Sequence, residues 1–389
     1  MRFEFATASR IVFGVGVLKE AGALAAGLGR RAFVVTGRSG ERAAPLLADL
    51  QAAGVEAVTF TVAGEPTTDL VREGTAQARG AGCDLVIGIG GGSVIDTGKA
   101  IAALLTNGGD PLDYLEVIGR GRPITQPSVP YIAIPTTAGT GAEVTANAVL
   151  AAQREGSREH RLKVSLRSPL MLPRVALVDP ALTYSMPPAL TASTGLDAFA
   201  QVLEPYVSLM ANPLTDTLCR EGLMRVAHSL RRAYQNGNDA EAREDMALVS
   251  LFGGLALANA KLGAVHGLAG VLGGMFDAPH GALCGRLLPF VMDANVKALQ
   301  ARDPDNPALE RYDDVAVILT GEWDVEAADG VAWVQDLCKA LGVPGLATYG
   351  VTAGVFADVI DKAMASSSMK GNPIKLTPAE VRGILMRAL

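Results

Sequence analysis

The chain has 389 residues, of which 49% are hydrophobic and 19% are charged. A chain of this length exceeds the size at which one hydrophobic core can keep growing, so we expect two domains. The high hydrophobic fraction excludes an intrinsically disordered protein. The formal net charge is -6 and the pI is about 5.4, which leaves no basic surface for the phosphates of nucleic acids. DNA and RNA are therefore not expected as partners.

The cysteines and the apolar segments bear on the cell compartment. Neither a disulfide framework nor a thiolate zinc site is expected, because the cysteines are scattered and form no CxxC pair: Cys83, Cys219, Cys284 and Cys338. The N-terminus has no apolar leader, and no stretch reaches about 18 uninterrupted apolar residues. The longest apolar region, residues 253–276, is interrupted by polar residues and glycines and predicts buried helix. We predict a cytoplasmic protein.

Residues 1–180 alternate short apolar runs with helical patterns. The runs that predict strands are residues 31–36, 55–62, 84–89, 131–134 and 175–178. Helical patterns over residues 41–53 and 69–81 separate the first three runs. This β-α-β-α-β order predicts an α/β domain with a parallel sheet covered by helices.

Residues 181–389 differ from the first part of the chain. Ala, Leu and Met dominate, strand-like alternation disappears, and proline breaks separate long helical patterns such as residues 213–234. The sequence therefore predicts an all-α second domain.

A glycine loop, Gly90, Gly91, Gly92 and Ser93, joins the third predicted strand to a helix. Residues without Cβ let the backbone approach a pyrophosphate, and the helix N-terminus supplies free N–H groups. We interpret the loop as a phosphate site. The alternative is a glycine turn that serves only the tight packing of strand against helix.

A second loop, residues 135–145, also follows a predicted strand and combines hydroxyl groups with glycines. Its Thr136 and Thr137 have the chemistry to hydrogen-bond a ribose or an amide. An ordinary Thr/Gly loop is an equally good interpretation of this segment alone.

The chain has four histidines, His160, His228, His266 and His280. The last two are each followed by glycine in a glycine-rich region, and imidazole is the commonest protein ligand of divalent transition metals. A lone histidine in such an apolar setting is more often an ordinary packed side chain than a metal ligand, and the pair alone does not decide between the two.

Asp197 lies within an otherwise apolar helical pattern, where a buried carboxylate needs a cation or a role as helix N-cap. Gln201 follows four residues later on the same helix face. The two side chains can therefore reach one ligand, and the N-cap role of Asp197 is the alternative.

Six segments occur in the order found in one enzyme family: residues 90–100, 135–145, 176–183, 194–198, 265–267 and 279–281. Together they resemble the iron-containing (group III) alcohol dehydrogenases. The resemblance implies the two-domain architecture shared with dehydroquinate synthase, with NAD(P) bound by residues 1–180 and a metal by the helical residues 181–389. It also implies a substrate between the domains and a homo-oligomer.

The resemblance further implies roles for individual residues. Gly90, Gly91, Gly92 and Ser93 correspond to the pyrophosphate site, while Thr136, Thr137 and Lys163 line the rest of the dinucleotide site. Asp197, His266 and His280 correspond to catalytic metal ligands, with Gln201 beside them. The implied activity is metal-assisted hydride transfer, with Fe²⁺ or Zn²⁺, between NAD or NADP and a small alcohol or aldehyde.

Three positions depart from the family pattern. Gln201 stands where the family usually has histidine, and Gly270 where it often has a histidine thought to relay protons. Gly37 stands where NAD-preferring relatives have aspartate, and the adjacent Arg38 could meet a 2′-phosphate. These positions leave the choice of metal and of cofactor open.

Three other functions are considered. The main alternative is a maleylacetate-reductase-like enzyme that reduces a keto or enol acid without metal; the missing histidines favour it and Asp197 opposes it. A dehydroquinate-synthase-like lyase fits the order of motifs poorly. The last alternative is a protein that binds a dinucleotide but catalyses no reaction. Oxidation of the reduced cofactor in the presence of any aldehyde would exclude it.

Overall fold

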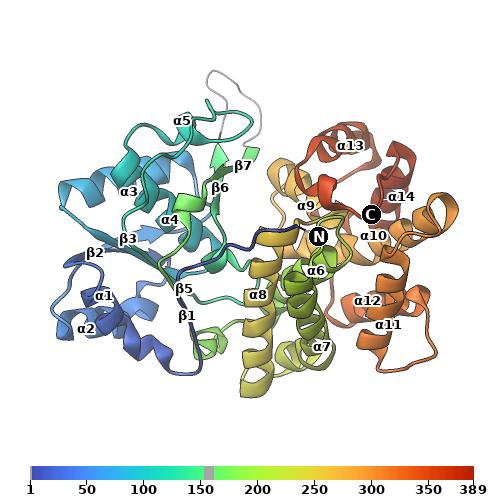
Figure 1. Cartoon of the computed structure of the whole chain (residues 1–389), viewed down its shortest axis with the longest axis horizontal. Coiled ribbons are helices and arrows are strands. Elements are labelled where there is room, and N and C mark those ends of the chain that lie inside the picture. The colour runs from blue at the N-terminus through green and yellow to red at the C-terminus, as the bar shows by residue number, and fades with distance from the viewer. Residues whose placement is uncertain (1, 153–161) are drawn as a thin grey trace. The chain divides into compact units, whose positions relative to one another are not determined.

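The computed structural model describes residues 2–152 and 162–389 (Figure 1). The chain divides into two compact units. The sheet unit comprises Ala6–Thr137 and Gly141–Thr183, and the helical unit comprises Met1–Phe5, Ala138–Thr140 and Tyr184–Leu389. The predicted fold class, a parallel α/β domain followed by a helical domain, is confirmed.

Among the described residues, six parallel strands form the main sheet in the order β1-β8-β5-β4-β2-β3. Their bounds are Ile11–Phe13 (β1), Arg31–Gly37 (β2), Glu56–Val62 (β3), Leu85–Gly90 (β4), Tyr131–Pro135 (β5) and Val175–Val178 (β8). The five predicted strands are all present. The central strands are buried on both faces, which explains their continuous apolar runs.

The helices of the sheet unit cover both faces of this sheet. Their bounds are Ala21–Ala26 (α1), Ala44–Ala52 (α2), Thr68–Gly80 (α3), Gly92–Asn107 (α4) and Pro111–Tyr114 (α5). Alternate residues of one strand face opposite layers: Val34 packs with α1 and α2, whereas Phe33 and Val35 pack with α3 and α4 (Figure 1). A separate antiparallel pair, Asn147–Ala152 (β6) and Leu162–Arg167 (β7), was not predicted.

The helical unit has one large apolar core. Its helices are Pro188–Tyr206 (α6), Pro213–Gln235 (α7), Ala240–Ala260 (α8), Ala264–Met275 (α9), His280–Arg302 (α10), Ala308–Thr320 (α11), Ala327–Ala340 (α12), Phe356–Ala365 (α13) and Pro378–Ala388 (α14). Every residue of α6 from Gly195 to Tyr206 is buried, so polar side chains on this helix lie inside the protein.

Of the described helices, no single one has the length and apolar character needed to cross a membrane. Only α8 and α9 meet those criteria together, and they are bent by 101° at the break between them. The long apolar region of residues 253–276 is thus the end of one helix and the whole of another. The two meet around Lys261, which has a left-handed φ of 61°.

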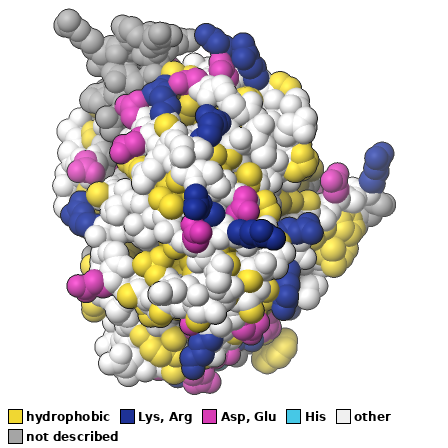
Figure 2. Space-filling view, turned by 90° about the vertical axis from the view of Figure 1, so that its left-hand side faces the viewer, with side chains coloured by type: hydrophobic (Ala, Val, Ile, Leu, Met, Phe, Trp, Pro, Cys, Tyr) yellow, Lys and Arg dark blue, Asp and Glu magenta, His cyan; other side chains and the backbone are white. Residues whose placement is uncertain are grey.

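The surface carries charges of both signs. On the face shown in Figure 2, Lys and Arg side chains are interspersed with Asp and Glu. This mixed distribution matches a formal net charge of only -6 for the whole chain.

Candidate functional site

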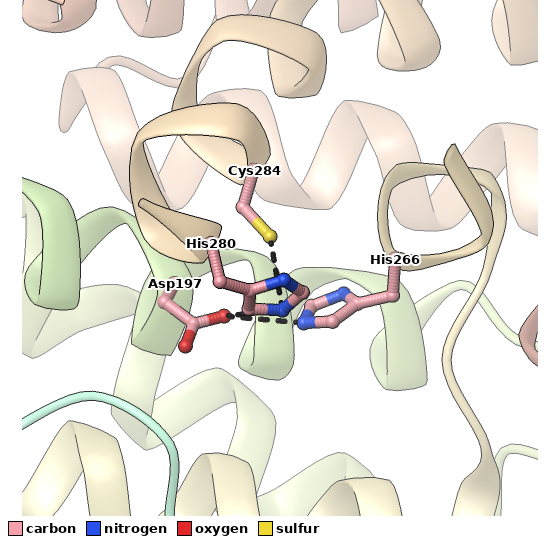
Figure 3. A group of neighbouring side chains, drawn as sticks. All are labelled: Asp197, His266, His280 and Cys284. Atoms are coloured by element: carbon pink, nitrogen blue, oxygen red, sulfur yellow. Dashed lines mark hydrogen bonds and ion pairs between the residues drawn. The ribbon is translucent and has the colours of Figure 1, made fainter. Parts of the chain in front are cut away.

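Asp197 lies in the middle of α6 and is only 3% exposed. The helix begins at Pro188, nine residues earlier, with Pro187 at the N-cap position. The N-cap role considered for Asp197 is therefore excluded. Its carboxylate is instead directed at two imidazole rings (Figure 3).

His266, in the first turn of α9, and His280, the first residue of α10, supply these rings. The distance from Asp197 Oδ1 is 3.2 Å to His266 Nε2 and 3.8 Å to His280 Nε2. The exposed fractions of the side chains are 4% for Asp197, 7% for His266 and 35% for His280. The structure thus brings together three of the predicted site residues, and solvent reaches them on the side of His280.

The start of α10 is held against α6 by a close backbone contact. A Cβ at Gly281 would lie 2.0 Å from the carbonyl oxygen of Ser193, so only glycine fits there. One turn later, a Cβ at Gly285 would lie 2.5 Å from Leu196 Cδ1. These contacts fix the position of His280 relative to Asp197.

Glu204 belongs to the same cluster, although the sequence analysis did not single it out. It is 4% exposed, and its Oε2 lies 2.6 Å from His266 Nδ1. The backbone N–H of Val265 donates to Oε1 at 2.6 Å. A proton on Nδ1 shared with Glu204 leaves Nε2 of His266 free as a ligand atom, the usual arrangement behind a metal-binding histidine.

The electrostatic balance of the cluster favours charged forms despite burial. Burial raises the pKa of Asp197, but the nearby imidazoles of His280 and His266 outweigh it, and the net shift is downward. Burial lowers the pKa of His266, yet Cys284, Asp197 and Glu204 raise it well above its ordinary value. The pocket therefore stabilises positive charge beside Asp197.

Gln201 lies one turn after Asp197 on α6 and is 3% exposed. Its side chain helps to lower the pKa of the Asp197 carboxyl, while its Oε1 is buried without a hydrogen-bond partner. An unpartnered acceptor is costly inside a protein. This oxygen lies near α8, 3.3 Å from where a Cβ at Gly253 would be. The fit of the residues to a metal therefore rests on the carboxylate of Asp197 and the two imidazoles.

Cys284 was also missed. It lies one turn after His280 on α10, and its Sγ is 3.6 Å from His280 Nε2. One donor atom from each of Asp197, His266, His280 and Cys284 lies within 4.8 Å of the others. Carboxylate, imidazole and thiolate are the donors that zinc and related divalent metals use.

The glycine loop and the threonine loop lie side by side at the carboxyl ends of β4 and β5. Gly90 pairs with Pro135, and the backbone N–H of Thr136 donates to Gly90 O at 2.9 Å. Gly91 occupies the N-cap position of α4, where no side chain caps the helix. Ser93 lies in the first turn of α4. This is the arrangement in which anions bind at a helix N-terminus.

The packing alternative explains only part of the glycine loop. A Cβ at Gly90 would lie 2.5 Å from Val94 Cγ2, so packing alone requires glycine at that position. A Cβ at Gly91 would be 3.4 Å from the Thr137 side chain, which is an ordinary contact. Packing therefore leaves Gly91 unexplained, whereas close approach of a ligand to the backbone accounts for it.

The remaining predicted residues have partners in the sheet unit. Lys163 on β7 forms an ion pair with Glu65 at 3.0 Å, and Arg38 donates to the carbonyl oxygen of Ala63 at 3.0 Å. At Gly37, the last residue of β2, an added Cβ would meet nothing closer than a side-chain atom at 3.9 Å. Position 37 therefore has room for a larger residue.

Comparison with known proteins agrees with this geometry. The chain matches the family model for iron-containing alcohol dehydrogenase over residues 8–180 and the C-terminal model of the Fe-containing alcohol dehydrogenase family over residues 191–389. The 1,3-propanediol dehydrogenase of Klebsiella pneumoniae is 36% identical over 346 residues, which cover 87% of this chain and 85% of that protein. The choline dehydrogenase of Bacillus subtilis (strain 168) is 33% identical, with 99% and 94% covered.

Solved structures are similar over the whole length. A crystal structure of 1,3-propanediol oxidoreductase has a TM-score of 0.91 and 33% identity, with 100% of both chains covered. The sulfoacetaldehyde reductase of Bifidobacterium kashiwanohense in complex with NAD⁺ has a TM-score of 0.86 and 27% identity, with 100% and 99% covered. The predicted resemblance and enzyme class are confirmed: the chain belongs to the iron-containing alcohol dehydrogenase family and is an alcohol dehydrogenase.

Proposed function

We propose that this enzyme transfers hydride between a nicotinamide cofactor and a small alcohol or aldehyde, with a divalent metal held by Asp197, His266 and His280. The observation that carries the proposal is the convergence of their ligand atoms from α6, α9 and α10. A bound divalent ion would act as a Lewis acid that polarises the substrate carbonyl. Gln201 is included as a further ligand.

The protein side chains supply charge and orientation. Asp197 is the carboxylate that balances the ion, and Glu204 holds His266 in the tautomer with Nε2 free. His280, the most exposed of the three predicted ligands, lies where a small substrate can reach the centre. Position 270 holds glycine, so no side chain there can relay a proton, and the proton must reach solvent by another route.

The dinucleotide would use mainly backbone groups of the sheet unit. Gly90, Gly91, Gly92 and Ser93 would hold its pyrophosphate at the N-terminus of α4, and Thr136, Thr137 and Lys163 would line the rest. Without an acidic side chain at Gly37 to bind a ribose hydroxyl or repel a phosphate, NADP is accepted as well as NAD.

The names of the relatives support a primary alcohol or its aldehyde as substrate. They include dehydrogenases of 1,3-propanediol, choline and 4-hydroxybutyrate and a reductase of sulfoacetaldehyde. The four free cysteines support a reducing compartment, the cytoplasm, and we infer a homo-oligomer from the family.

Metal analysis of protein purified without added ion, with an activity screen on aldehydes and keto acids, tests the proposal. We expect aldehyde reduction that a chelator abolishes and that Fe²⁺ or Zn²⁺ restores. Reduction of a keto acid that survives complete removal of metal would replace this proposal with the maleylacetate-reductase-like alternative.

A further inference from the structure

The metal centre lacks one strong donor, and Cys284 is placed to supply it. Asp197, His266 and His280 provide one carboxylate and two imidazoles, and the position one turn after Asp197 holds a neutral amide. We propose that the Cys284 thiolate is a metal ligand, which makes this an Asp-His-His-Cys centre. The inference rests on the proposed function, since it concerns the same metal.

The distances among the donor atoms fit one ion. Ligand atoms in a tetrahedral site with bonds of about 2.0 to 2.3 Å lie roughly 3.3 to 3.8 Å apart. The separations are 3.2 Å from Asp197 to His266, 3.8 Å from Asp197 to His280 and 3.6 Å from His280 to Cys284, which are close to this range. The remaining pairs of donor atoms, which include Cys284 with Asp197 and with His266, lie within 4.8 Å. Cys284 therefore lies at ligand distance from His280, without any change of backbone.

The placement of Cys284 is set by the helix that carries His280. The two residues are four apart on α10, so both side chains lie on one helix face. Figure 3 shows the Cys284 sulfur directed at the His280 ring, which lies beside Asp197 and His266. Gly281 and Gly285, which follow them, let this face lie close against α6. Cys284 is fully buried, whereas His280 is 35% exposed, so the sulfur lies on the inner side of the centre.

Ligand chemistry favours sulfur over the amide of Gln201. A thiolate carries a full negative charge and is a donor that zinc uses in protein sites. An amide oxygen is neutral and is a weaker donor for such a metal. Coordination breaks the S–H bond: the electron pair stays on sulfur, and the proton leaves to solvent.

The experiment uses Co²⁺ as the probe, added to the full-length protein after its own metal has been removed. A cobalt–thiolate bond produces a near-ultraviolet charge-transfer band, which Asp, His and Gln ligands do not. We expect this band in the parent protein. Cys284→Ser should lose it and should bind Co²⁺ at least about 10-fold more weakly, since even loss of a group that only orients a ligand costs that much.

Cys219→Ala is the matched control, because Cys219 is also a fully buried helical thiol but lies outside the cluster. It should keep both the band and the affinity. Tight Co²⁺ binding without the band in the parent protein overturns the role of Cys284 and leaves the metal-dependent function standing. Absence of Co²⁺ binding overturns both, and the band in the parent protein is informative even if Cys284→Ser does not fold.

Discussion

The glycine loop and the metal cluster are two sites built from different parts of the chain. The loop uses one continuous segment at the start of α4, and its ligand groups are backbone N–H groups. The cluster uses side chains from α6, α9 and α10, and Asp197 and His266 are 69 residues apart. The loop therefore depends on the absence of side chains and the cluster on their identity.

This difference determines what a mutation can do at each site. At the loop, added bulk interferes with ligand or packing, and a new charge changes which ligand is preferred. At the cluster, removing a donor lowers affinity directly, because each buried donor balances its neighbours. A mutation at one site should therefore lower binding of its own ligand and leave binding at the other site unchanged.

The largest effect is expected from Asp197→Ala, which removes the carboxylate that lies beside His266 and His280. Metal affinity and turnover should fall together by at least about 100-fold, since the change removes a proposed ligand and not merely its support. Fluorescence titration should show unchanged NADH binding. Asp197→Asn, which keeps the shape without the charge, separates charge from packing; full turnover in both variants would contradict the metal assignment.

Glu204→Gln should have the next largest effect. The variant keeps one acceptor oxygen for the Val265 N–H, but it places an amide NH2 near His266 Nδ1 and removes the charge that orients the imidazole. We expect metal affinity to fall about 10- to 100-fold, the usual cost of losing such a partner. Equilibrium dialysis and a melting curve of the metal-free protein are measured together. A lower melting temperature with unchanged affinity would reduce Glu204 to a structural partner of α9.

Gly37→Asp should change the choice of cofactor and leave the metal unaffected. The end of β2 has room for the side chain, and a carboxylate there can bind a ribose hydroxyl and repel a 2′-phosphate. We expect the ratio of kcat/KM for NADH over NADPH to rise by about 10-fold, or about 1.4 kcal/mol. Gly37→Asn, of equal size and uncharged, is the control. An unchanged ratio would place the ribose away from β2.

Gln201→His should have the smallest effect. Imidazole is a better donor than an amide oxygen for iron or zinc, so metal affinity should rise by a few-fold up to about 10-fold. Dialysis against the parent protein measures it. The gain should be larger in a Cys284→Ser background, where a donor is missing. If Gln201→His leaves the dissociation constant of the metal unchanged both in the parent protein and in Cys284→Ser, position 201 does not contact the metal.

The sequence predicted the main strands and the helical second half because their signals are local. The strands of the central sheet are apolar on both faces, and each is followed by turn residues. Strand β1 has only three residues, too few for a pattern, and the β6–β7 pair flanks residues 153–161, which include His160 and lie outside the described part of the chain.

At the site, the sequence pointed to Asp197, His266 and His280 but not to the side chains that support them. Glu204 had a usable signal: with Asp197 and Gln201 it occupies one face of an apolar helix at spacings of four and three. Cys284 had a weaker one, its spacing of four from His280. Neither spacing shows that two helices meet there, because that depends on packing between distant segments.

The contact between Gly281 and Ser193 has a kinetic consequence. With α10 against the backbone of α6, His280 stays near Asp197 without help from an ion. A centre assembled by its helices requires no loop ordering when the metal arrives, so little conformational entropy is lost on binding. Loading of the metal-free protein should then be a single rapid step whose rate follows ion concentration, with no slow rearrangement afterwards.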